Sequence, residues 1–167
     1  EHHLPSSTYA ALAKSAQQYP NAPALSFFLD ANKFKHCYTW TYQALFANIT
    51  RAANAFHQLG IGKDDVIAFV LPNLPETHFT IWGGEAAGIV MAINPLLEGG
   101  QIAELVRSAR AKVLVTLAPT PQVDLWRKLR QHLAEMPELR TVVWVNMAPY
   151  VGIKAPILHY LAMHEQH

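Results

Sequence analysis

Cysteine is nearly absent from this chain of 167 residues, in which Cys37 is the only one. A single cysteine cannot form an internal disulfide, so we predict a fold without disulfide staples in a reducing compartment. Cys37 lies in a β-like run, 35–42. We therefore expect a half-buried packing residue there rather than a catalytic nucleophile.

Long hydrophobic runs and an excess of one charge are also missing. The longest apolar run, 86–97, is interrupted by Gly88, Asn94 and Pro95, whereas a spanning helix needs about 18 apolar residues. The formal net charge is +1, which gives no reason to expect nucleic acid or an anionic membrane as partner. Without a signal-peptide pattern, we expect a cytoplasmic protein, with peripheral membrane contact left open.

Nine histidines are present, and five of them lie near the ends of the chain. His164 and His167 have the spacing of one helix face, but no second pair or acidic partner accompanies them. Zinc sites require several ligands brought together. We expect no metal site.

Motifs that hold phosphates or activate nucleophiles are missing as well. The chain has no Gly-x-x-x-x-Gly-Lys-Ser/Thr loop, no Gly-x-Gly-x-x-Gly between strand and helix, and no Gly-x-Ser-x-Gly elbow. We therefore predict no catalytic and no cofactor-binding residue in this chain.

What the sequence does contain is a regular alternation of helical and extended patterns. Helices are predicted at 6–19, 45–59, 74–87, 101–110 and 123–134, a β-hairpin at 24–29 and 36–41, and strands at 66–71, 89–93, 113–116 and 141–145. The continuous apolar run 66–71 is typical of a strand buried on both faces of a parallel sheet. The fold class predicted is α/β, a mostly parallel sheet flanked by helices with an N-terminal β-hairpin.

Three polar residues follow the predicted strands, at the edge where α/β sheets bind ligands. Asn73 and Glu76 come after the strand 66–71, and Asn94 follows the strand 89–93. These three residues are the candidates for contacting a substrate. The alternative is local: Asn73 with Glu76 could form a capping arrangement and Asn94 a turn. His78, on the same helix as Glu76, could act as a base only with a partner.

Six segments, in this order and spacing, resemble the N-terminal region of AMP-forming acyl-CoA synthetases, the adenylate-forming ligases. They are Tyr38-Thr39-Trp40-Thr41-Tyr42-Gln43-Ala44-Leu45, Ala52 to Ile61, Lys63-Asp64-Asp65-Val66-Ile67-Ala68, Leu71-Pro72-Asn73-Leu74-Pro75-Glu76, Ala87 to Leu96, and Glu104 to Thr116. Asp64 stands where the family usually has glycine. The resemblance implies residues 1–146 as the N-terminal α/β subdomain and 147–167 as a tail or the start of a next subdomain.

The resemblance also implies the chemistry of the whole enzyme. ATP, Mg²⁺ and coenzyme A would serve an ATP-dependent, AMP-forming fatty acid (carboxylate)–CoA ligase. In that family a Ser/Thr/Gly-rich phosphate loop and a catalytic lysine normally follow this region. We therefore expect an inactive piece of a ligase, with the remaining subdomains as partners and self-association through exposed faces.

Two other interpretations stay open at this point. The chain could be a stand-alone interaction module that is not catalytic. It could also be a small α/β domain that binds a ligand at Asn73 and Asn94. The apolar stretch 157–163 could contact lipid, although covering exposed core is the simpler role.

Overall fold

The computed structural model describes residues 4–120 and 125–150, which form two compact units. One unit lies within Glu1–Gly60 and Leu74–Ala87 and is called the helix–hairpin unit. The other lies within Ile61–Asn73 and Gly88–His167 and is called the sheet unit. The predicted boundary at 146/147 follows the last strand of the sheet unit and stays a prediction.

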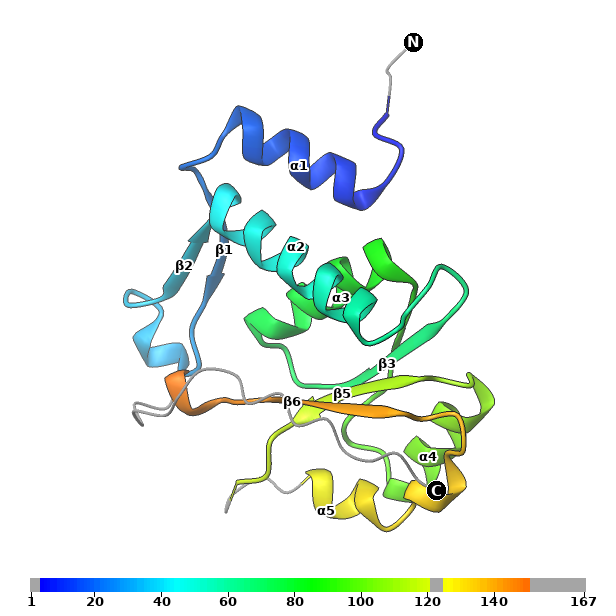
Figure 1. Ribbon diagram of the computed structural model, residues 1–167. Helices are drawn as coiled ribbons and strands as arrows, with labels where there is room; N and C mark the ends of the chain where they lie inside the picture. Colours follow the sequence, from blue (N-terminus) through cyan, green and yellow to red (C-terminus); the bar gives the residue numbers. More distant parts are fainter. Residues whose placement is uncertain (1–3, 121–124, 151–167) are drawn as a thin grey trace. The chain divides into compact units, whose positions relative to one another are not determined.

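Three helices and a two-stranded hairpin make up the helix–hairpin unit (Figure 1). Its elements are α1 (Thr8–Gln18), β1 (Pro23–Phe27), the 3₁₀ turn η1 (Ala31–Lys33), β2 (Tyr38–Thr41), α2 (Tyr42–Gln58) and α3 (Pro75–Ala87). The strands β1 and β2 pair antiparallel, which confirms the predicted hairpin. Each of the three helices packs against the other two.

The apolar stripe of α2 forms the core of this unit. Leu45, Ile49, Ala53 and Phe56 recur at helical spacing and are all buried. Thr41 caps the helix, because its hydroxyl accepts a hydrogen bond from the backbone N–H of Ala44 at 3.2 Å. The predicted stripe and cap are confirmed.

The sheet unit contains four parallel strands in the order β4-β3-β5-β6. Its elements are β3 (Val66–Val70), β4 (Ile89–Ala92), α4 (Gly99–Ser108), β5 (Val113–Leu117), α5 (Leu125–Arg130), η2 (Leu133–Glu135), β6 (Thr141–Val145) and η3 (Ala148–Tyr150). The parallel pairing confirms the predicted fold class.

One face of this sheet is covered by α4 and α5. Ala68 and Val70 of β3, with Leu114 of β5, form a single buried cluster with side chains of the two helices. The helix residues are Ile102, Ala103, Val106, Leu125 and Leu129. Arg127 and Lys128, in the densest basic group of the chain, are exposed on α5. They form a solvated helix face.

Four local expectations are corrected by the structure. Cys37 is exposed and precedes β2, because the strand begins only at Tyr38. The strand β4 is an edge strand, and Ile89 is 49% exposed rather than buried. The helix predicted at 123–134 is described only as Leu125–Arg130 followed by η2, and residues 121–124 lie outside the described part. The fourth correction concerns the start of α3.

The helix α3 begins at Pro75, so Asn73 is not its cap. Proline suits the first helical position, where its missing N–H leaves no hydrogen bond unmade. The Thr77 hydroxyl accepts a hydrogen bond from the backbone N–H of Leu74 at 3.3 Å. Thr77 therefore takes the part in the cap that was expected of Glu76.

An ion pair links the loop before β3 to the loop before β5. The Asp65 carboxylate contacts the Lys112 ammonium and accepts a hydrogen bond from the backbone N–H of Gly62 at 2.9 Å. The hydrogen bond from Lys112 and then the one from Gly62 hold the pKa of Asp65 below its usual value.

Replacing Asp65 by asparagine is therefore expected to lower stability in a pH-dependent way. Because the pKa of Asp65 is lower in the folded state than in the unfolded state, its interactions stabilise the fold at pH values above the unfolded pKa of about 3.9. This stabilisation is lost as the pH falls through the folded-state pKa. The difference in unfolding free energy between wild type and Asp65→Asn should be present at pH 6 and shrink below pH 4. Urea unfolding at both pH values measures it, and a difference that does not change with pH would contradict the assignment.

Among the described residues, no helix has the length and hydropathy needed to cross a bilayer. The apolar stretch 157–163 and the histidines at 159, 164 and 167 lie outside the described residues. The expectations about them stay predictions.

Candidate functional site

The carboxyl edge of the parallel sheet carries two of the three predicted site residues. Asn73 follows β3 and Asn94 follows β4, and these two strands are hydrogen-bonded neighbours with Phe69 opposite Ala92. Both asparagines are exposed. The structure thus places them after adjacent strands at one edge, where α/β sheets bind ligands.

The Asn94 side chain already has a local role. Its Oδ1 accepts a hydrogen bond from the backbone N–H of Leu96 at 2.9 Å. This is an Asx turn, the arrangement that makes asparagine common in loops. The role of Asn94 as a substrate contact stays a prediction.

Glu76, the third candidate, lies in the first turn of α3 in the helix–hairpin unit. Its side chain is half-buried. Carboxylates are favoured in the first turn of a helix by the helix dipole. The role of Glu76 as a substrate contact stays a prediction.

His78 is also accounted for by packing. Its ring lies 5.4 Å from that of Trp82, one turn further along α3. Burial lowers the pKa of His78, which favours the neutral imidazole. The geometry describes an aromatic contact rather than a catalytic base.

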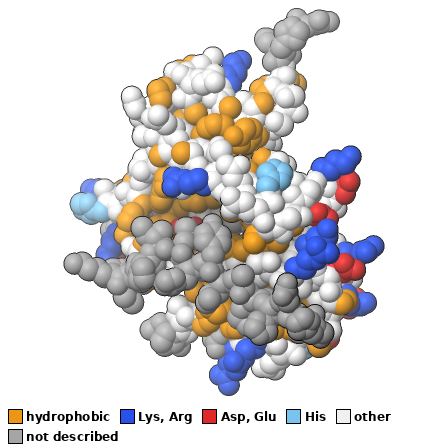
Figure 2. Space-filling model, viewed as in Figure 1, with side chains coloured by type: hydrophobic (Ala, Val, Ile, Leu, Met, Phe, Trp, Pro, Cys, Tyr) orange, Lys and Arg blue, Asp and Glu red, His pale blue; other side chains and the backbone are white. Residues whose placement is uncertain are grey.

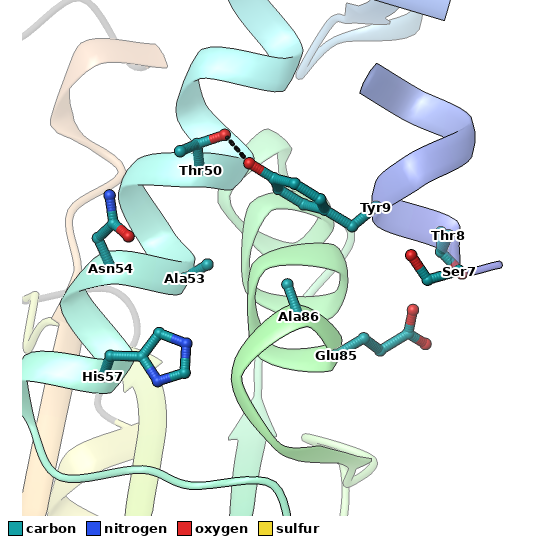
Figure 3. Close-up of a pocket in the computed structure, with 9 residues that line it drawn as sticks. All are labelled: Ser7, Thr8, Tyr9, Thr50, Ala53, Asn54, His57, Glu85 and Ala86. Carbon is teal, nitrogen blue, oxygen red and sulfur yellow. Dashed lines mark hydrogen bonds between the residues drawn. The ribbon is translucent and has the colours of Figure 1, made fainter. Parts of the chain in front are cut away.

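A polar hollow that the sequence did not reveal lies within the helix–hairpin unit (Figure 3). It has a volume of about 560 Å³ and is bounded by the start of α1, the second half of α2 and the end of α3. The residues that line it are Ser7, Thr8, Tyr9, Thr50, Ala53, Asn54, His57, Glu85 and Ala86.

Hydroxyl, amide, imidazole and carboxylate groups meet in this hollow. The Tyr9 and Thr50 hydroxyls are hydrogen-bonded at 2.9 Å and join α1 to α2. In Figure 3 the Glu85 carboxylate extends toward Ser7, whose hydroxyl accepts a hydrogen bond from Ala10 at 3.1 Å. Such a lining suits a neutral or cationic polar molecule, because the Glu85 carboxylate would repel an anion.

A signal for this hollow exists in the sequence. Thr50, Asn54 and His57 have i, i+4, i+7 spacing and so share one face of α2. They form a polar stripe beside the apolar one. The residues that complete the hollow come from α1 and α3, and only the tertiary structure brings these together.

The residues described by the structure contain no group of three or more His, Cys, Asp or Glu side chains that could hold a metal ion. The expectation that this chain holds no catalytic and no cofactor-binding residue stays a prediction.

Comparison with known proteins decides the family. The model of the AMP-binding enzyme family matches residues 12–155. The chain belongs to this family. The predicted resemblance to AMP-forming acyl-CoA synthetases is thereby confirmed.

The curated relatives that this chain matches include CoA ligases. Marinolic acid–CoA ligase of Pseudoalteromonas sp. is 36% identical over 118 residues, which are 71% of this chain and 18% of that protein. Crotonobetaine/carnitine–CoA ligase of Salmonella arizonae is 34% identical over 114 residues, covering 68% of this chain and 21% of that protein. The chain therefore spans about a fifth of the length of the curated relatives it matches.

A solved structure supports the fold. Coronafacic acid ligase from Pectobacterium brasiliense matches with a TM-score of 0.69 and 14% sequence identity, over 83% of this chain and 25% of that one. The predicted fold, a subdomain of the acyl-CoA synthetase fold, is confirmed by this likeness.

Proposed function

We propose that this chain is the N-terminal part of an ATP-dependent, AMP-forming carboxylate–CoA ligase. The observation that carries the proposal is the family match over 12–155 together with relatives of which the chain spans only about a fifth. The name of marinolic acid–CoA ligase includes an acid, which supports a carboxylate as the substrate class. A fatty acid is the narrower form of this proposal.

The chain's own contribution in this proposal is a scaffold. The parallel sheet supplies a carboxyl edge with the exposed Asn73 and Asn94, against which further segments and substrate would bind. ATP, Mg²⁺ and coenzyme A are cofactors of the whole enzyme in this view. The phosphate loop and the catalytic lysine would come from segments outside these 167 residues, and a cytoplasmic location is part of the same proposal.

The isolated 167-residue chain is expected to catalyse no exchange of pyrophosphate into ATP that depends on a carboxylate. Stabilising the transition state at phosphorus needs preorganised donors and metal, and in this proposal they belong to segments outside the 167 residues. Incorporation of labelled pyrophosphate with a series of fatty acids measures the activity. Circular dichroism must show that the chain is folded, and a full-length AMP-forming ligase serves as positive control.

If the isolated chain catalyses pyrophosphate exchange faster than the reaction without protein, the proposal that the catalytic residues lie outside this chain is wrong. The alternative is a binding module that lacks chemistry, which the hollow of about 560 Å³ in the helix–hairpin unit favours. Absence of exchange combined with a saturable rise in melting temperature with a small polar molecule would support that alternative. The substitution Glu85→Gln should then reduce the rise in melting temperature if the molecule is a cation.

A further inference from the structure

The loop that joins β1 to β2 exposes apolar side chains to an unusual degree. Phe28, Leu29 and Phe34 are 46%, 50% and 56% exposed. All three lie within residues 28–37, which we call the hairpin loop. This loop is at the end of the hairpin away from α1, since β1 leaves from the C-terminal end of that helix (Figure 1). It is a tip rather than a groove.

The hairpin loop also carries positive charge. Lys33 and Lys35 are exposed beside the apolar side chains, and the Lys35 ammonium lies 5.8 Å from the centre of the Phe34 ring. Asp30 is the one carboxylate in the segment, and it accepts a hydrogen bond from the backbone N–H of Asn32 at 2.9 Å. In Figure 2 hydrophobic, basic and histidine side chains lie together at the left edge of the molecule.

The size of this patch argues against a stable protein partner. Two half-exposed phenylalanines and a leucine offer on the order of 300 Å² of apolar surface, whereas a stable interface buries about 800 Å² on each partner. A lipid surface has no such requirement. Aromatic and leucine side chains enter the interfacial layer while neighbouring lysines remain at the headgroups.

We propose that the hairpin loop, residues 28–37, docks the protein on an anionic lipid surface. The near-zero net charge of the whole chain gave no hint of this, because the charge that matters is local. The lysines attract anionic headgroups, and Phe28, Leu29 and Phe34 insert between them. Docking requires none of the ligase chemistry, so it stands or falls independently of the proposed function.

Cys37 provides a reporter, because it is exposed and is the only cysteine of the chain. An environment-sensitive fluorophore on Cys37 should shift to the blue with vesicles of mixed phosphatidylglycerol and phosphatidylcholine. Pure phosphatidylcholine vesicles should give a much smaller shift, and about 0.5 M salt should weaken binding by screening. Sedimentation of the unlabelled Cys37→Ser chain with the same vesicles checks that the label does not create the affinity.

Two double variants test the positive charge and the apolar side chains of the hairpin loop separately. Replacing Lys33 and Lys35 by glutamine should lower partition into anionic vesicles roughly 30-fold, since each lysine near the surface contributes about 1 kcal/mol. Replacing Leu29 and Phe34 by serine should abolish the blue shift at every lipid composition. The matched control, Lys14→Gln with Tyr19→Ser, removes one exposed cation and one exposed aromatic ring from the α1 region and should bind as wild type.

Three results would overturn the proposal. One is no binding of the folded chain to anionic vesicles. Another is equal binding by the loop variants and the wild type, which would place the lipid contact elsewhere. The third is a blue shift that depends on protein concentration without vesicles, which would make the loop a contact between copies of the chain.

Discussion

Substituting Gly83 by alanine should destabilise the helix–hairpin unit by about 2 kcal/mol, the range in which overpacking of a core falls. A Cβ at this position of α3 would lie 2.6 Å from the Ala52 Cβ, 2.9 Å from the Ile49 carbonyl oxygen and 3.0 Å from the Ala53 nitrogen. Two of these atoms belong to the backbone of α2 and cannot turn aside. The two helices would have to separate, and the contact between them is the most extensive in the unit.

The expected loss from overpacking must outweigh helix propensity, which acts in the opposite direction. In an unconstrained helix, alanine is favoured over glycine by about 1 kcal/mol. Urea unfolding gives the change in stability, and hydrogen exchange followed by mass spectrometry should show faster exchange in α2 and α3. Gly62→Ala is a control, since a Cβ there would lie 3.6 Å from an Asp65 carboxylate oxygen, an ordinary contact. If Gly83→Ala were as stable as wild type, the close approach of α2 and α3 would be wrong.

The sequence pattern predicted helices and strands best where the spacing of apolar residues was the only signal. The stripe in α2 follows from the spacing of Leu45, Ile49 and Phe56, all of which are buried. The strands β3 and β5 follow from continuous apolar runs. The apolar run in β4 did not predict that Ile89 is exposed on an edge strand. An apolar run indicates a strand, but it does not indicate which strands pair with it.

Competition between local signals accounts for the incorrect start of α3. Asn73 is a good cap and Glu76 completes the expected spacing, but Pro75 occupies the first helical position and Thr77 supplies the cap hydrogen bond. Among the site residues, the sequence placed Asn73 and Asn94 after adjacent strands through the rule for α/β sheets. It could not find the hollow, since Tyr9, His57 and Glu85 come from three helices that are joined only by tertiary packing.

Glycines in this fold therefore have opposite roles that the sequence does not distinguish. Gly60 has a φ of 81° after α2 and serves as the expected left-handed C-terminal residue. Gly83 instead provides space for a neighbouring helix. The adjacent Gly99 and Gly100 at the start of α4 allow a glycine in close contact with a neighbouring helix to be compared with one that is not.

Gly99→Ala should destabilise the sheet unit, whereas Gly100→Ala should leave it unchanged or slightly more stable. A Cβ at Gly99 would lie 2.5 Å from the Lys128 carbonyl oxygen, which is backbone of α5. At Gly100 the nearest atom would be the His132 Cε1 at 3.5 Å, an ordinary contact. Overpacking predicts a loss of about 2 kcal/mol for the first variant, and helix propensity a gain of up to about 1 kcal/mol for the second.

The adjacent pair isolates packing from every other effect. Both residues lie in the first turn of α4, between the N-cap Glu98 and Gln101, so changes in capping and in the unfolded chain are nearly the same for both substitutions. A loss of 2 kcal/mol would lower the urea midpoint by roughly 1 M if the slope is about 2 kcal/mol per molar. Equal midpoints for the two variants would contradict the close contact of Gly99 with α5. A lower midpoint for Gly99→Ala alone would show that α5 packs on α4 through the backbone at Lys128, which fixes how closely these helices cover the sheet.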